Sequence, residues 1–131
     1  MHYSDFLNKI FDGTSAIYHR AASQVVTPAA QASTDTYADV AGSTLDTLGY
    51  QSVAYTCVNA HATRVLHWKV IGGNDSAFAD AVTVQAEADI AGTAVANYSA
   101  TVAVWRYYKV QIQSQDSGLA CNATVRGICK G

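Results

Sequence analysis

Val82–Ile90, with the sequence VTVQAEADI, is the stretch that decides the fold class. Its apolar residues occupy every second position and alternate with Thr, Gln, Glu and Asp. Successive side chains of a β-strand point to opposite faces of the sheet, so this period of two predicts a strand with one buried and one solvated face. We expect the buried face to hold Val82, Val84, Ala86, Ala88 and Ile90.

Further strand patterns lie on both sides of this stretch. Those before it are Tyr37–Val40, Tyr50–Asn59 with Val53, Tyr55 and Cys57 on one face, and Thr63–Ile71 with Leu66, Trp68 and Val70 on one face. After it, Ala91-Gly92 turns the chain, and the remaining strands are Val102–Ser114 and Ala120–Cys129, with a turn at Asp116-Ser117-Gly118 between them. Short strands, regular turns and no later helix predict an all-β fold, an antiparallel, jelly-roll-like β-sandwich over residues 34–131.

Residues 1–33 have a different character and are expected to form a short N-terminal helix and an extended arm. The helix is indicated by Phe6, Leu7, Ile10 and Phe11 at helical spacing, with Ser4 or Asp5 as its cap. A helix of about two turns is not stable alone in water, so its apolar stripe must dock on its own sandwich, on a neighbouring subunit or on a capsid. We therefore predict an interface at Phe6, Leu7, Ile10, Phe11 and, from the arm, Tyr18.

The composition excludes several classes of partner. The chain has 131 residues and 13.9 kDa, which is the size of one domain, and 50% of its residues are hydrophobic but only 14% are charged. We expect so uncharged a surface to meet other proteins. A net charge of −2 without a basic cluster argues against nucleic acid, and no apolar run is long enough for a membrane helix. The N-terminus lacks the features of a signal peptide, so we expect synthesis in the cytoplasm.

No arrangement of side chains predicts catalysis, a metal or a cofactor. His61 and His67 are not expected to converge on a metal, and Cys57 is expected to be a small buried core residue rather than a nucleophile. The three cysteines Cys57, Cys121 and Cys129 have no zinc or disulfide spacing and are expected to be buried free thiols. Asp75 and Asp80, in the segment after Gly72-Gly73, offer oxygen ligands of the type that calcium prefers, but a turn is the favoured interpretation.

Two aromatic residues of the predicted strand Val102–Ser114 are candidates for an exposed surface. Tyr108, Val110 and Ile112 are expected in the core, which places Trp105 and Tyr107 on the other face of that strand. There they would form an interface with a protein, or a platform on which sugars stack in a carbohydrate-binding or adhesin module. A small hydrolase is a further alternative, weakened by the absence of a usable Cys or His constellation.

Three segments carry a resemblance to a known family. They are STLDTLGYQSV at 43–53, LHWKV at 66–70 running into GNDSAFAD at 73–80, and RYYKVQI at 106–112. They resemble, in order, the LDT-x-G-[YF]-x-S entry to a strand, a strand leading to an SND or SDD turn, and a YxRV strand of small β-sandwich virion proteins of tailed bacteriophages. The chain has Gly73 where that family commonly has Ser, and the N-terminal forty residues are not covered.

The resemblance implies a structural virion protein without an active site. Such proteins decorate or cement the capsid, and others belong to the neck, tail or fibre. The partners implied are the major capsid protein or other virion proteins, together with further copies of the chain, and the location implied is the virion. Many weak contacts on a symmetric shell gain strength by multivalency, so modest interfaces suffice. The low charge and the docking helix favour capsid decoration.

Overall fold

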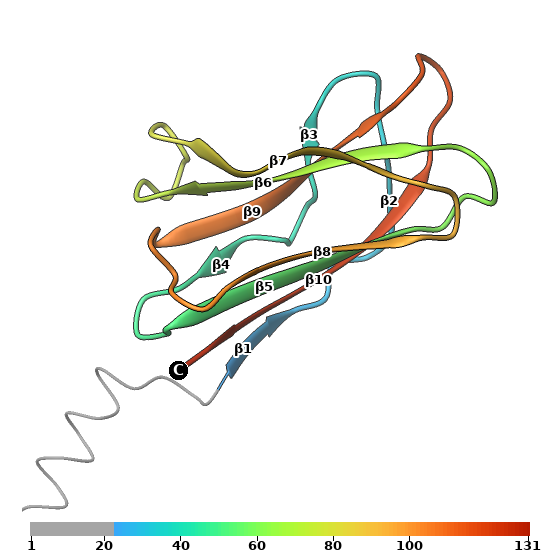
Figure 1. The fold of residues 1–131 in the computed structure, drawn as a ribbon. Helices are drawn as coiled ribbons and strands as arrows, with labels where there is room; N and C mark the ends of the chain where they lie inside the picture. Colours follow the sequence, from blue (N-terminus) through green and yellow to red (C-terminus); the bar gives the residue numbers. More distant parts are fainter. Residues whose placement is uncertain (1–22) are drawn as a thin grey trace, which may run out of the picture.

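The computed structural model describes residues 23–131, which form two antiparallel sheets packed face to face (Figure 1). Sheet A has the order β1 (Ser23–Val26), β10 (Asn122–Lys130), β5 (Ser52–Asn59), β8 (Val95–Ala100), and β2 (Gln31–Ala32) also pairs with β10. Sheet B has the order β3 (Ala38–Asp39), β9 (Tyr107–Ser114), β6 (Leu66–Gly73), β7 (Val82–Ile90), and β4 (Leu45–Asp46) also pairs with β9.

The order of the strands is that of a jelly roll. From β3 onward the chain places β3 and β4 in sheet B, β5 in A, β6 and β7 in B, β8 in A, β9 in B and β10 in A. Repeated crossing between two antiparallel sheets is the defining feature of this architecture. The predicted all-β sandwich is therefore confirmed, whereas the predicted N-terminal helix lies outside the described residues. In the described part of the chain, no helix is long and apolar enough to cross a membrane.

The end of the predicted arm contributes to the sandwich. β1 pairs with the C-terminal half of β10, with Val25 opposite Ile128, and β2 pairs with its first residues. Pro28 is buried between these two short strands, and its carbonyl accepts a hydrogen bond from Arg126 at 3.0 Å. The sandwich thus includes strands that begin before Thr34, where the change in sequence pattern occurs.

The core lies between the sheets and is built from alternating residues of the central strands. Val53, Tyr55 and Cys57 of β5 are fully buried. They face the equally buried rows of β6 and β9, which are Leu66, Trp68, Val70, Tyr108, Val110 and Ile112. These rows confirm the faces predicted for the three strands.

The face predicted for β7 is only partly right. Ala88 and Val84 pack against the core and Ile90 is buried, but Val82 and Ala86 are exposed. The cause is a change of register between β6 and β7, which shifts once between Trp68 and Val70 and again after Val70. Such β-bulges insert extra residues into one strand and so change which side chains face inward.

Tyr55 connects the two sheets with a polar contact inside the core. Its hydroxyl donates to the carbonyl oxygen of Ser43 at 2.6 Å and to that of Tyr108 at 3.0 Å. The Ser43 hydroxyl in turn accepts a hydrogen bond from the N–H of Val110 at 3.1 Å. Burial raises the pKa of Tyr55 well above its ordinary value, so the hydroxyl stays neutral and keeps donating.

Candidate interaction surface

The three segments that carry the sequence resemblance meet at one end of the sandwich. β4, from the first segment, pairs with the start of β9, from the third, with Leu45 opposite Tyr108. β6, from the second segment, also pairs with β9, with Gly73 opposite Tyr107. The end at which β9 begins is therefore built by all three segments, which are far apart in the sequence.

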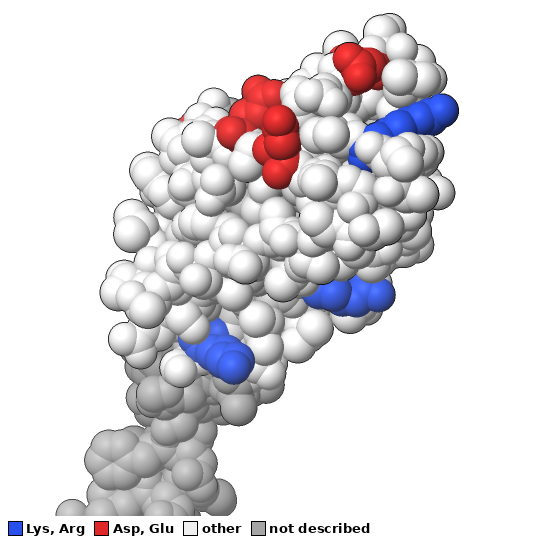
Figure 2. Space-filling view, turned by 45° about the vertical axis from the view of Figure 1, so that its right-hand side comes forward, with Lys and Arg blue, Asp and Glu red and all other residues white. Residues whose placement is uncertain are grey.

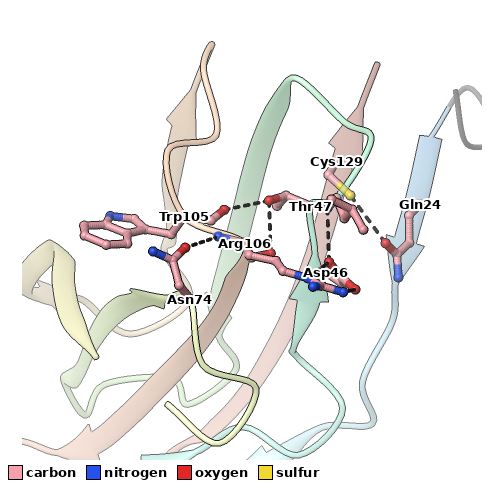
Figure 3. Close-up of polar contacts among 8 residues, drawn as sticks. Gln24, Asp46, Thr47, Asn74, Trp105, Arg106 and Cys129 are labelled. Carbon is pink, nitrogen blue, oxygen red and sulfur yellow. Dashed lines mark hydrogen bonds and ion pairs between the residues drawn. The ribbon is translucent and has the colours of Figure 1, made fainter. Parts of the chain in front are cut away.

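Polar contacts fix this end, and Figure 3 shows that they converge on the backbone before β9. The Thr47 hydroxyl donates to the carbonyl oxygens of Trp105 at 2.6 Å and Arg106 at 3.0 Å. The N–H of Arg106 donates to the side-chain oxygen of Asn74 at 3.2 Å, and its guanidinium forms an ion pair with Asp46 at 3.3 Å. Loops from both sheets are thus held in one rigid arrangement around Arg106.

Asp75 and Asp80 organise the loop between β6 and β7. The Asp80 carboxylate accepts the N–H groups of Asn74 at 3.0 Å and Asp75 at 3.0 Å, and Asp75 accepts the N–H of Ala79 at 3.0 Å. The interpretation of this segment as a turn is confirmed.

Phe78 adopts a positive φ of 59° within the turn, and its ring lies edge-on to Tyr107, with centroids 6.4 Å apart. The loop is therefore packed on the outer face of β9.

Acid is expected to lower the free energy of unfolding by protonating carboxylates that accept hydrogen bonds in the folded protein. Hydrogen bonds from Asp75 and Asn74 lower the pKa of Asp80, and those from Gly118 and Ser117 lower the pKa of Asp35. Both folded-state pKa values lie below the ordinary 3.8, so this stabilisation is complete above about pH 4 and is lost as the pH falls below it. Urea unfolding at a series of pH values measures it.

Asp80→Asn is the variant that checks this pH dependence. At pH 7 it should unfold at lower urea concentration than the wild type, because an amide oxygen is a weaker acceptor for two N–H groups than a carboxylate. Below about pH 3 the difference should shrink, since the wild-type carboxylate is then becoming protonated too. A difference that stays constant from pH 7 to pH 2 would contradict the assignment.

Trp105 and Tyr107 do not share a face, contrary to the prediction. Tyr107 faces outward on sheet B, and the guanidinium of Arg106 lies 5.0 Å from its ring centroid. Trp105 is half-buried and packs against the core, beside Val84 and so close to Gly72 that a Cβ there would lie 2.7 Å from the indole. The strand begins only at Tyr107, so strand alternation does not extend to Trp105. The two rings cannot form one platform for a sugar.

An exposed apolar patch lies beside Trp105. Leu48 is 52% exposed and Val104 is 72% exposed, and with Trp105 they border a hollow of about 250 Å³ at this end of the sandwich. We call Leu48, Val104 and Trp105 the apical patch. Leu48 lies in the turn from Thr47 to Tyr50, directly before Gly49, which has a positive φ of 85°. The turn is closed by a hydrogen bond from the N–H of Tyr50 to the carbonyl of Thr47 at 2.8 Å. Neither Leu48 nor Val104 is among the interface residues predicted from the sequence.

The outer face of sheet B carries a network of charges. His67 lies between Glu87, at 2.7 Å from its Nδ1, and Asp89, at 2.9 Å from its Nε2. Lys109 forms an ion pair with Asp39 at 2.8 Å.

His61 lies in the loop after β5, where its Nδ1 accepts backbone N–H groups, so His61 and His67 do not converge. Among residues 23–131, no group of three His, Cys, Asp or Glu side chains is arranged to hold a metal ion.

All three cysteines are buried free thiols, as the sequence predicts. Burial raises the pKa of Cys57 to about 12, so its thiol stays protonated at neutral pH. The Cys129 thiol lies 3.6 Å from the side-chain oxygen of Gln24, its partner residue on the neighbouring strand β1 (Figure 3). Nucleophilic chemistry at Cys57 is therefore disfavoured.

The other predicted interface residues are Phe6, Leu7, Ile10, Phe11 and Tyr18, and they lie outside the described residues. Figure 2 shows a face of the described part on which charged side chains are few and separated by wide uncharged areas. This sparse charge agrees with the composition.

No protein-family model matches the sequence, and no curated protein matches it either. Solved structures are similar in fold. The PBSX exported protein XepA has a TM-score of 0.57 at 14% identity, and the match covers 85% of this chain but only 37% of that chain. The SPBc2 prophage-derived protein YomS has a TM-score of 0.52 at 10% identity, covering 83% and 93% of the two chains.

A third similar structure is that of the disulfide-linked pili that form Bacillus endospore appendages. Its TM-score is 0.52 at 14% identity, and the match covers 82% of this chain and 85% of that chain. At such identities, the likeness to all three structures shows a shared sandwich fold.

Proposed function

We propose that this protein is a structural component of a tailed-bacteriophage virion and that it decorates and cements the capsid through contacts with the major capsid protein. The observation that carries the proposal is the apical patch, in which Leu48 and Val104 are exposed around a hollow. Exposed apolar side chains grouped on a rigid surface are typical of protein–protein contacts. Leu48 belongs to one of the segments that resemble virion proteins, and Val104 and Trp105 directly precede another.

The fold and the charge support a structural role. Among the proteins of similar fold, YomS is prophage-derived, and the sandwich is a scaffold that needs no active site to act as a building block. A surface with few charges makes contacts that change little with salt, which suits a particle that leaves the cell. The protein would be made in the host cytoplasm and be retained in the virion.

The N-terminal stripe is proposed as a second contact, on the capsid or on a neighbouring copy. Phe6, Leu7, Ile10 and Phe11, with Tyr18 in the arm, would reach away from the sandwich because the chain enters β1 at Ser23, at the edge of sheet A. Tyr107 is available on the outer face of sheet B for a third contact. A carbohydrate-binding role is less well supported, since Trp105 and Tyr107 lie on different faces.

The test is co-sedimentation of the purified protein with shells of the major capsid protein of the same phage. The wild type should bind, and the double variant Leu48→Asp, Val104→Asp should bind at least ten-fold more weakly, because it places two charges in an apolar contact. Leu119→Asp is the matched control. Leu119 is also an exposed leucine, at 40%, but it follows the other end of β9.

The outcomes separate the alternatives. Unchanged binding of the double variant would remove the apical patch from the interface, and deletion of residues 1–22 then tests the N-terminal stripe while leaving β1 in place. Failure of the wild type to bind shells would contradict capsid decoration. A density map of the native virion with the chain in the neck, tail or fibre would replace it by one of those roles.

A further inference from the structure

The free edge of β8 is the strongest feature that the proposed function does not use. β8 is the last strand of sheet A and pairs only with β5, with Tyr98 opposite Tyr55 at its centre. No backbone hydrogen bond among residues 23–131 reaches its other side. An unpaired strand edge is a row of N–H and C=O groups that another strand can join.

The register identifies the backbone groups that point to this edge. In an antiparallel ladder, opposite residues alternate between hydrogen-bonded and non-hydrogen-bonded pairs. The N–H of Asn59 donates to the carbonyl of Ala94 at 3.0 Å, so every second residue counted from Ala94 bonds to β5. The N–H and C=O groups left facing the free edge are therefore those of Val95, Asn97 and Ser99.

The β8 edge also lacks the features that prevent strand addition. Residues 91–105 have the sequence AGTAVANYSATVAVW, which contains no charged residue and no proline. β7, the corresponding edge of sheet B, has two register shifts and carries the exposed Glu87 and Asp89. Charges and bulges are the usual protection of an edge strand. β1, β3 and β4 are at most four residues long.

We propose that β8 pairs antiparallel with β8 of a second copy of this chain, so that sheet A continues across the two copies. A second copy is favoured over other strands because the edge complements itself. A two-fold axis at Asn97 places Asn97 opposite its own copy, where two side-chain amides can hydrogen-bond. It also places Val95 opposite Ser99 and the small Ala96 opposite the large Tyr98.

Absence of charge is a requirement of this self-pairing. Only residues near the two-fold axis lie close to their own copies, so a charge there would face a like charge and be repelled. In β7, pairing of this kind would bring the carboxylates of Glu87 and Asp89 together. The exposed Val95, at 58%, and Val102, which follows β8, would lose contact with water in the dimer. The inference is independent of the capsid proposal, since it concerns only copies of this chain.

The experiment is sedimentation equilibrium of the full chain with charge variants at the axis. The wild type should be a dimer of twice 13.9 kDa. Asn97→Lys and Asn97→Asp should each weaken self-association by roughly ten-fold or more, because like charges face each other. An equimolar mixture of the two variants should restore the dimer. Asn122→Lys and Asn122→Asp, exposed on β10 of the same sheet, are the matched controls and should dimerise like the wild type.

Each other outcome overturns the proposal. A wild type that stays monomeric at high concentration, or charge variants at Asn97 that dimerise normally, would exclude β8 as the interface. A polymer instead of a dimer would indicate a head-to-tail contact with another edge. A dimer that is lost on deletion of residues 1–22 would indicate that the N-terminal segment of the partner, and not its β8, makes the contact. Thermal unfolding of every variant ensures that the sandwich is intact.

Discussion

Replacing Trp68 by alanine is expected to lower the free energy of unfolding by about 3–5 kcal/mol, the cost typical of deleting a large buried aromatic side chain. Trp68 is among the largest fully buried side chains and lies in β6. Because β7 and β9 hold β6 from both sides, the surroundings cannot collapse into the space left behind. For a chain of this length, the melting temperature should fall by roughly 10–20 °C. Circular dichroism during thermal and urea unfolding measures both quantities.

The other tryptophan provides the control for this variant. Trp105 is half-buried at the end of the sandwich, so Trp105→Ala should cost only about 1–2 kcal/mol. A smaller loss for Trp68→Ala than for Trp105→Ala would contradict the placement of Trp68 at the centre of the core.

The faces of the central strands could be predicted from the sequence because partners hold these strands on both sides. β5 lies between β10 and β8, and β6 lies between β7 and β9. A strand held on both edges keeps a strict alternation, since a slip by one residue would bring every polar side chain into the core. The alternation of Val53, Tyr55 and Cys57 therefore survives unchanged in the structure.

The edge strands were harder to predict for the same reason. β7 has one free edge, so bulges can shift its register, and Val82 and Ala86 become exposed although the sequence alternates perfectly. β8 is absent from the strands that the sequence predicts, because Ala, Asn and Ser at most of its positions have low strand propensity. It forms because β5 pairs along its whole length. β1 likewise falls within the extended arm that the sequence predicts.

The arrangement of the candidate site could not be predicted, because it depends on which loops share an end of the sandwich. Thr47 and Asn74 contact the backbone of residues 105–106 across separations of 58 and 32 residues. The sequence did indicate the three segments, through their resemblance to virion proteins. It gave no sign that the chain before β9 crosses from sheet A to sheet B and exposes Val104 on the way.

Gly127→Val is expected to lower the free energy of unfolding by about 3 kcal/mol or more, although valine favours strands more than glycine does. Gly127 lies opposite Tyr55 in the pairing of β10 with β5. A Cβ at Gly127 would come within 2.5 Å of the Tyr55 ring and 2.9 Å of Val26. The ring cannot move aside, because its hydroxyl is fixed on Ser43 and Tyr108.

A double variant identifies the Tyr55 ring as the cause. In a Tyr55→Leu background the ring is absent, so adding Gly127→Val should cost at least 1 kcal/mol less than it does in the wild type. Thr124→Val is the matched control on the same strand. Thr124 is half-buried on the outer face of sheet A, so the same β-branched side chain should change stability there by no more than about 0.5 kcal/mol. Equal costs of Gly127→Val in both backgrounds would mean that the penalty arises from the backbone, and not from the packing of Tyr55 across the strand pair.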